Sequence, residues 1–369
     1  MNIEQPSAQW KDYELIDSGD FSKLERFGKY IAIRPEPKAL WSKSLSDAEW
    51  RRMAQTEFKP GAGFGKAGKE DSGTWVALGK MPEQWVIGYE GSPKGPKFNL
   101  RLGLTSFKHV GVFPEQAPNW EFIYANTSRL VKAAAAAKAP VPKVLNLFAY
   151  TGAASLAARV AGADVTHLDS VRQVVTWAKG NMELSRLSDI RWVVEDALKF
   201  VRREARRGNK YQGLILDPPA YGHGPNGEKW KLDECLFEML TECSAILAPK
   251  DSFMVLNLYS NGYSAVLADT VVRRAFAALI GGGQPADGQR GDAQPGGGSR
   301  GDGQPGGGSR GDGQPGDGSR GDAQPGLRGG ALSKGSQAAG SDQLSYGELV
   351  LRDRFDKALP LSVFSRLVL

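Results

Sequence analysis

The stretch KVLNLFAYTG, at residues 143–152, constrains the fold of this chain more than any other. Its first half is an apolar run typical of a buried strand, and its second half is a turn that ends at a glycine. The Ala-rich segment at residues 153–161 follows at once and favours a helix. A strand, a turn ending in glycine and a helix predict a nucleotide-sized pocket at the carboxyl edge of an α/β sheet.

The alternation of strands and helices continues to about residue 280. Apolar runs end near residues 169, 194, 217 and 258, and helical segments lie at 171–186, 197–207, 232–247 and 264–280. Runs such as GLIL and FMVL suit strands buried on both faces, as in a parallel sheet. Two strands from residue 346 onward are expected to close the sheet with an antiparallel edge strand. The predicted fold class is therefore α/β, with a doubly wound Rossmann-like sheet.

Residues 1–115 lack this alternation and are predicted to form a small β-rich domain, for which RNA binding is one candidate role. Short segments at 13–16, 29–33, 75–78, 85–89 and 98–102 favour strands, and a polar loop is expected at 18–28. The Gly- and Lys-rich stretch at 58–73 is either a phosphate-contacting arm or a solvated connector. Composition does not decide between the two.

A repetitive segment interrupts the second predicted domain, which covers residues 116–280 and 341–369. Residues 281–340 contain a ten-residue near-repeat such as RGDGQPGGGS. Gly, Pro, Gln and Ser cannot bury enough apolar area to offset the entropy lost on ordering, so we expect a disordered insertion. A surface insertion of this length costs little stability, because loop-closure entropy grows only logarithmically with length.

Composition limits the compartment and the partners. The net charge of +6 favours a polyanionic partner such as RNA. The only cysteines, Cys235 and Cys243, provide neither a disulfide framework nor a zinc spacing, which suits a reducing cytoplasm. No run of 18 apolar residues and no apparent secretory signal occur, so we expect a cytoplasmic protein with no membrane span and no metal site.

The turn within FAYTG is rich in aromatic residues. A dinucleotide-binding turn needs small residues so that the backbone can approach a pyrophosphate. Phe148 and Tyr150 occupy those positions, and Thr151 and Gly152 complete the turn. Bulky side chains there would crowd a pyrophosphate but leave room for an adenosine with a methionine tail.

Two acidic residues are expected at the same edge of the sheet. Asp169 ends the second strand, where its carboxylate can accept both ribose hydroxyls of an adenosine or cap the next helix. Asp196 follows the third strand, where it can bind the adenine amine or only cap the helix that begins at Ala197.

The segment LILDPPAYG, at residues 214–222, is the strongest local signal. An apolar strand delivers Asp217 to the carboxyl edge, and Pro218 and Pro219 stiffen the chain beyond it. Pro218 has no amide hydrogen, so this corner offers mainly acceptors, which suit an N–H donor that is being alkylated. Tyr221 could stack on a planar base. The alternative is a strand that simply ends in a loop.

In their order and spacing, NLFAYTG, HLDS, EDA and DPPAYG resemble the motifs of class I S-adenosylmethionine-dependent methyltransferases. They are most similar to the branch that includes the bacterial 23S ribosomal RNA large-subunit methyltransferases I and K. The resemblance covers about residues 108–258 and the closing strands, and it implies S-adenosyl-L-methionine as the cofactor. GVFPEQ, at residues 111–116, looks like the segment that covers the cofactor in that branch.

The resemblance also implies roles for single residues. Those expected to hold the cofactor are Phe148, Tyr150, Thr151 and Gly152 around the methionine, Asp169 and Ser170 at the ribose, Asp196 and Ala197 at the adenine, and Asp217. The residues expected to face the methyl group and its acceptor are Asp217, Pro218, Pro219 and Tyr221.

Two features depart from that branch. Enzymes that make 5-methylcytosine attack the base with a cysteine in the fourth or sixth motif, because carbon 5 needs covalent activation. Those places read DPPAYG and LNLYSNG here, so a nitrogen acceptor is favoured over cytosine C5. In addition, the N-terminal residues do not resemble the PUA domain of methyltransferase I.

The predicted function is methylation of a base in RNA, with ribosomal RNA as the expected substrate. Residues 222–232 are expected to form a mobile substrate loop, in which Lys229 meets a phosphate or is merely solvated and His223 is more simply a solvated residue. Two alternatives stay open, a nicotinamide-dependent oxidoreductase and a non-catalytic RNA-binding protein that keeps the fold. Oligomeric state has no signal in the sequence.

Overall fold

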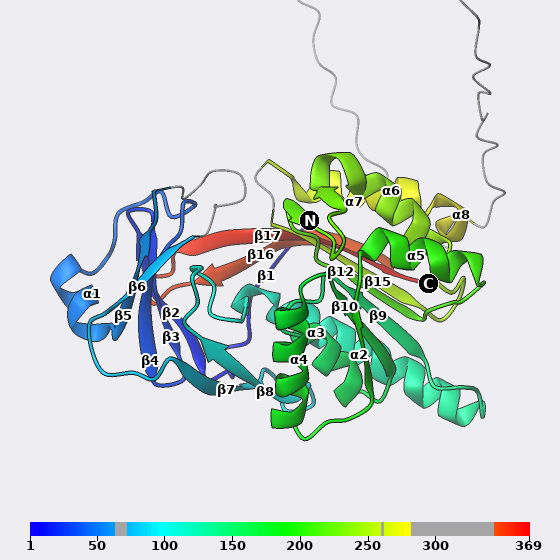
Figure 1. Cartoon of the computed structure of the whole chain (residues 1–369), viewed down its shortest axis with the longest axis horizontal. Coiled ribbons are helices and arrows are strands. Elements are labelled where there is room, and N and C mark those ends of the chain that lie inside the picture. The colour runs from blue at the N-terminus through cyan, green and yellow to red at the C-terminus, as the bar shows by residue number, and fades with distance from the viewer. Residues whose placement is uncertain (63–71, 260–261, 282–342) are drawn as a thin grey trace, which may run out of the picture. The chain divides into compact units, whose positions relative to one another are not determined.

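An eight-stranded mixed sheet forms the α/β part of the protein, as the computed structural model shows (Figure 1). The structure describes residues 1–62, 72–259, 262–281 and 343–369. Across the sheet, the strands are β1 (Asn2–Glu4), β16 (Gln343–Arg352), β17 (Ala358–Val368), β15 (Phe253–Leu258), β12 (Gly213–Leu216), β9 (Lys143–Leu147), β10 (Asp164–Asp169) and β11 (Ile190–Val194).

Strand direction decides where a site can form. The five neighbours β15, β12, β9, β10 and β11 are all parallel, so their carboxyl ends meet at one edge. The antiparallel strand is β17, which lies between β15 and β16, so the prediction that it forms the edge of the sheet is wrong. The outermost strand beyond β16 is β1, so the first residues of the chain belong to this sheet.

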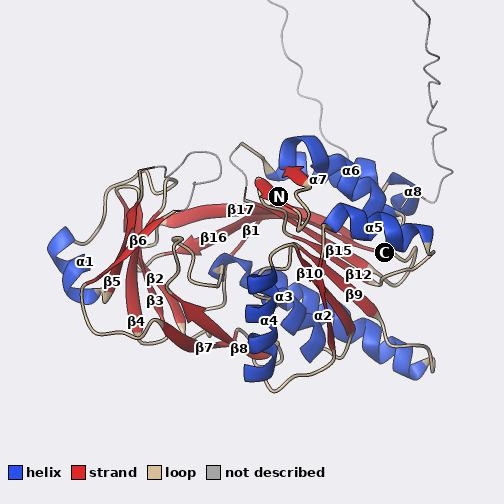
Figure 2. Ribbon diagram, viewed as in Figure 1, coloured by secondary structure: helices blue, strands red, loops and turns tan. Residues whose placement is uncertain are grey.

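Helices cover both faces of the sheet (Figures 1 and 2). One face carries α2 (Ala117–Ala136), α3 (Ala153–Val160) and α4 (Arg172–Leu184), and the other carries α5 (Ala197–Arg206), α6 (Leu232–Ser244), α7 (Ala265–Ala275) and α8 (Ala277–Ile280). Alternation along β9 shows the two layers, because Val144 packs in one core and Leu145 and Leu147 pack in the other. The predicted doubly wound α/β fold is confirmed.

The N-terminal residues form two further sheets. One has the order β2 (Tyr13–Gly19), β3 (Ser22–Phe27), β4 (Tyr30–Pro35), β5 (Thr56–Pro60) and β6 (Gly73–Ala77), and the other pairs β7 (Gln84–Glu90) with β8 (Lys97–Gly103). The short helix α1 (Asp47–Met53) begins with a capping box between Ser46 and Glu49. A 3-10 turn, η1 (Pro114–Gln116), precedes α2.

One sequence prediction in this region is wrong. The polar stretch at residues 18–28 contains the interior strand β3 instead of a loop. Its carboxylate Glu25 is fully buried, which is tolerated because Arg34 of β4 lies 2.7 Å away and the Tyr13 hydroxyl donates to it. Such compensation comes from neighbouring strands, so local polarity does not reveal it.

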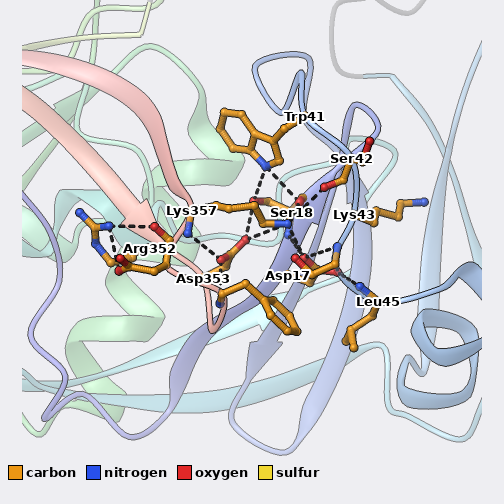
Figure 3. A network of polar contacts seen from close by, with 12 residues as sticks. Asp17, Ser18, Trp41, Ser42, Lys43, Leu45, Arg352, Asp353 and Lys357 are labelled. Atoms are coloured by element: carbon orange, nitrogen blue, oxygen red, sulfur yellow. Dashed lines mark hydrogen bonds and ion pairs between the residues drawn. The ribbon is translucent and has the colours of Figure 1, made fainter.

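The turn between β16 and β17 is fastened to β2 by polar contacts (Figure 3). Lys357 Nζ lies 2.8 Å from Asp17 Oδ1, and the Ser18 hydroxyl donates to Asp353 Oδ2 at 2.8 Å. The Asp17 side chain is fully buried and also accepts a hydrogen bond from Trp50 Nε1. The closing strands of the eight-stranded sheet and the N-terminal sheet therefore share one buried network.

Two predictions concern residues outside the described ranges. These are the disordered insertion at 281–340, apart from Gly281, and the centre of the Gly- and Lys-rich stretch, at residues 63–71. The domain limits at residues 115 and 116 stay predictions. Within the described ranges, no helix is both long and apolar enough to cross a membrane.

We predict that Lys357→Met lowers the free energy of unfolding by about 2 kcal/mol, because the buried Asp17 carboxylate loses its cation. Urea denaturation at neutral pH measures this change. Arg352→Met is the matched control, since Arg352 makes an exposed ion pair with Asp356 in the same turn. The control should cost less than about 1 kcal/mol. Equal losses in both variants would contradict a buried network.

Candidate active site

A pocket opens at the carboxyl ends of β9, β12 and β15, where the strand directions place it. Phe148 to Ala154 form one wall, and Val112, Phe113 and the start of α2 form another. Asp217 directly follows β12, and Asn257 lies near the end of β15. Both supply polar groups to the pocket. The segment GVFPEQ thus lies against the turn FAYTG.

The turn from β9 to α3 has an unusual backbone. Phe148, Tyr150 and Gly152 have φ angles of 56°, 49° and 93°, in the left-handed region that non-glycine residues seldom adopt. Such strain persists only where surrounding contacts fix the backbone. The buried Thr151 hydroxyl provides one of them by donating to the Gly111 carbonyl at 2.7 Å, and Asn181 donates to the Thr151 carbonyl at 2.9 Å.

Asp169 also holds this turn in place. One of its carboxylate oxygens accepts from the Tyr150 amide and the other from the Val171 amide, each at 3.0 Å. Burial raises the pKa of Asp169, against the lowering effect of these amides. The carboxylate therefore joins β10 to the turn after β9.

Asp217 is held by two side-chain amides. Gln116 Nε2 donates to Oδ2 at 3.1 Å, and Asn257 Nδ2 donates to Oδ1 at 3.0 Å. Burial raises the pKa of Asp217 to about 7, although the Asn257 hydrogen bond lowers it, and the nearby carboxyl of Glu115 adds to the rise. Its carboxylate is thus fixed in orientation and poised to change charge near neutral pH.

The structure brings only some of the predicted residues together. Those that line the pocket are Phe148, Tyr150, Thr151, Gly152 and Asp217. Those that do not line it are Asp169, Ser170, Asp196, Ala197, Pro218, Pro219 and Tyr221. Asp196 caps α5 by accepting from the Lys199 amide at 2.8 Å, which is the alternative that the sequence left open. Its role at an adenine stays a prediction.

The predicted mobile loop at 222–232 is a β-hairpin instead, made of β13 (Tyr221–His223) and β14 (Lys229–Lys231). Trp230 anchors it. The indole is buried, packs on Phe148 with ring centres 4.8 Å apart, and donates to the Pro219 carbonyl at 2.7 Å. The sequence pattern missed the two strands because each has only three residues, and Trp230 is the buried residue that anchors the hairpin.

Four polar residues of the pocket were not among the predicted site residues, namely Gln116, Asn119, Asn146 and Asn257, and two of these, Gln116 and Asn257, hold Asp217. Gln116 belongs to GVFPEQ, and Asn257 interrupts the apolar strand β15. A buried amide within an apolar run must find a partner, so Asn257 was a detectable signal. Gln116 was detectable as part of its motif. Neither partner could be named, because Asp217 lies 101 residues from Gln116 and 40 from Asn257.

The buried His167 does not supply a base to this pocket. Its Nδ1 lies 3.0 Å from the Ser155 hydroxyl, which also accepts from Asn146. Burial lowers the pKa of His167 to about 3, so the ring is neutral and structural.

The pocket fits S-adenosylmethionine better than a dinucleotide. Among its described lining residues, Asp217 carries the only formal charge, and no Lys or Arg is present to neutralise a pyrophosphate. Apolar and aromatic walls suit an adenosyl group, and an acidic pocket suits a cationic sulfonium. In the described part of the chain, no three His, Cys, Asp or Glu side chains form a candidate metal site.

Comparison with known proteins agrees with this fit, although no family model matches the chain. The chain is 30% identical over 167 residues to a ribosomal RNA large subunit methyltransferase K/L from Shewanella frigidimarina, with 44% of this chain and 21% of that protein aligned. With the K/L enzyme of Shewanella sp. strain ANA-3 it shares 32% identity over 206 residues, 54% and 26% of the two chains. It thus spans about a quarter of these relatives or less.

Solved structures cover the whole chain. The crystal structure of the SAM-dependent methyltransferase from Agrobacterium tumefaciens is 31% identical, with a TM-score of 0.71 over 100% of this chain and 93% of that one. A methyltransferase complexed with SAH is 13% identical, with a TM-score of 0.57 over 98% and 76% of the chains, and supports the fold alone. The nicotinamide-dependent alternative is not favoured. This chain belongs to the S-adenosylmethionine-dependent methyltransferases.

Proposed function

We propose that the protein methylates a base nitrogen of RNA, with Asp217 as the residue that receives and orients the acceptor N–H. The observation that carries this proposal is the Asp217 carboxylate, which is held by two amides inside a pocket with no other formal charge among its described lining residues. S-adenosylmethionine, when bound, supplies an activated methyl group.

Asp217 would act as an acceptor rather than as a nucleophile. Gln116 and Asn257 each occupy one oxygen, and each oxygen retains a lone pair for an incoming N–H. Orienting an amine in this way points its nitrogen at the reacting carbon, and positioning of this kind provides much of the rate in transfer reactions. The strained turn at Phe148 and Tyr150 would hold the cofactor, with Asp169 fixing that turn from below.

The cysteines support a nitrogen acceptor over cytosine C5. Cys243 is fully buried in α6 and burial raises the pKa of its thiol, which disfavours the thiolate. Cys235 lies on the same helix, and neither residue lines the pocket. A covalent attack on carbon 6 of cytosine therefore has no nucleophile among the described lining residues.

RNA as the substrate is supported by the outer face of the β13–β14 hairpin. Tyr221, His223, Lys229 and Lys231 are exposed on the face opposite Trp230, and the Tyr221 hydroxyl lies 3.1 Å from His223 Nε2. Aromatic rings interleaved with lysines suit bases and phosphates. The relatives named as ribosomal RNA methyltransferases support ribosomal RNA, and hence the cytoplasm, as part of the proposal.

The first prediction concerns the cofactor. Asp169→Ala should abolish measurable S-adenosylmethionine binding in calorimetry, because the Tyr150 amide loses its acceptor and the ribose loses a carboxylate. Asp196→Ala is the comparison, since it removes a helix cap worth about 1 kcal/mol and a predicted adenine contact. Unchanged affinity in Asp169→Ala would contradict the assignment of this pocket to S-adenosylmethionine.

The second prediction concerns pH. Because burial raises the pKa of Asp217 to about 7, the carboxylate is a minor species below pH 7 and the major one above it. The single-turnover rate of methyl transfer should rise with pH through a midpoint at or below about 7, since the cationic sulfonium, when bound, favours the carboxylate. Asp217→Asn should lower the rate and remove this step in the profile. A variant that keeps the same midpoint would show that another group titrates.

Asp217 also affects stability in a direction that can be tested. A carboxyl whose pKa is raised by folding keeps its proton in the native state after the unfolded chain has released its own. Its contribution to stability is therefore fully present at acidic pH and is lost as the pH rises toward about 7. Asp217→Asn should gain stability relative to the wild type over that interval, as measured by urea denaturation.

The third prediction concerns RNA. If Lys229 and Lys231 contact phosphates, Lys229→Gln with Lys231→Gln should flatten the plot of log affinity against log salt by about 0.7 for each contact. Titration of unmodified ribosomal RNA transcribed in vitro measures the slope. Lys250→Gln, an exposed lysine before β15 at the opposite edge, should leave it unchanged. RNA affinity without methyl incorporation into any RNA would favour the non-catalytic alternative.

A further inference from the structure

A continuous chain of hydrogen bonds joins Asp217 to the last strand of the sheet. Gln116 donates to Asp217 at 3.1 Å, Asn119 Nδ2 donates to Gln116 Oε1 at 2.7 Å, and Arg366 donates to Asn119 Oδ1 through both Nε and an Nη, at 2.9 and 2.7 Å. Asp217 directly follows β12, and the other three residues belong to η1, α2 and β17. Glu4 of β1 pairs with the other side of Arg366 at 2.9 Å.

The members between the two ends have little access to solvent. Arg366, Asn119 and Gln116 are 4%, 2% and 8% exposed, so water cannot readily replace their hydrogen bonds. The guanidinium is also packed between aromatic rings, 4.0 Å from the centre of Phe364 and 4.8 Å from that of Phe122. Its position is therefore fixed by packing as well as by charge.

The two ends of this chain determine the direction of the amides between them. A guanidinium can only donate hydrogen bonds, and an ionised carboxylate can only accept them. With Arg366 at one end, Asn119 must present its oxygen to Arg366 and its NH₂ to Gln116. Gln116 must then present its NH₂ to Asp217. Reversing either amide would place two donors or two acceptors against each other in a buried site.

We propose that Arg366 is a positioning residue that acts through Asn119 and Gln116 to keep Asp217 as a hydrogen-bond acceptor facing the pocket. With Arg366 in place, Gln116 offers Asp217 a donor, which binds the carboxylate more strongly than the protonated acid. Without Arg366, the two amides are free to turn, and Gln116 can offer its oxygen to a protonated Asp217. In this way β17 favours the ionised form of the carboxyl group that follows β12.

Of the other groups that face Asp217, Asn257 acts in the same sense as Gln116, and Glu115 acts in the opposite sense. Asn257 donates to the second oxygen and is itself oriented by the Ser362 hydroxyl at 3.0 Å. The carboxyl of Glu115 raises the pKa of Asp217 through like charge, and Tyr259 lies close enough for Asp217 to raise the pKa of its phenol. The hydrogen bonds from Asn257 and Gln116 therefore oppose the effects of burial and Glu115.

The test is an infrared pH titration of the carboxyl band of Asp217, identified by its loss in Asp217→Asn, in the protein without added cofactor or RNA. Arg366→Met should raise the midpoint by about one pH unit, a tenfold fall in the ionisation constant, since one donor to the carboxylate is lost. Arg366→Lys should keep the midpoint close to its wild-type value. If Arg366→Met does not fold, Gln116→Met removes the same donor and should give the same shift.

Glu4→Gln is the matched control, because it changes the charge beside the same guanidinium and leaves the amide chain intact. It should leave the midpoint in place or lower it slightly. A midpoint that is unchanged in both Arg366→Met and Gln116→Met, or that rises as much in Glu4→Gln, would overturn the inference. The inference rests on the proposed role of Asp217 only for its effect on methyl transfer. Because the titration measures no methylation, its failure is distinguishable from failure of the proposed function.

Discussion

The buried carboxylate of Asp217 is the interaction on which the architecture of the site depends. A carboxyl group inside a pocket is costly unless hydrogen bonds compensate for the lost water. Here the compensation comes from Gln116 in the segment before α2 and from Asn257 on β15. Arg366 and Ser362 on β17 orient those amides in turn. The strand β17 therefore contributes to the hydrogen bonding of a pocket that it does not line.

The opposite wall of the pocket rests on a second carboxylate. Asp169 accepts the Tyr150 amide and so fixes a turn in which Phe148, Tyr150 and Gly152 all have left-handed backbones. A turn of this kind would not persist in an isolated peptide, because each strained non-glycine residue costs on the order of 1 kcal/mol or more. The strain is held by the sheet edge, where β9 and β10 end side by side. A pocket with one negative group and no described cation follows from these two walls.

Much of the fold could be predicted because it depends on local patterns. Apolar runs such as GLIL read as strands buried on both faces, and the Ala-rich segment after Gly152 read as a helix; both occur as expected. The prediction failed where partners from distant parts of the chain decide the outcome. Glu25 lies in an interior strand because Arg34 neutralises its charge and the Tyr13 hydroxyl donates to it. The β13–β14 hairpin persists because Trp230 packs on Phe148. Gln116 belongs to the motif GVFPEQ, but its partner Asp217 lies 101 residues away along the chain.

The sequence by itself determined the order of strands and helices, the aromatic turn and the acidic residues at the strand ends, since these follow from periodicity and from the chemistry of single residues. From these came the cofactor class, which the comparisons support. Only the tertiary structure decided which of those residues meet. It placed Asp169 under the turn, Asp196 on a helix cap and Asp217 between two amides, and it joined Glu4 and Arg366 from the two ends of the chain. The physical reason is that hydrogen bonds and buried charges are satisfied across the sheet, between residues whose separation along the chain carries no local signal.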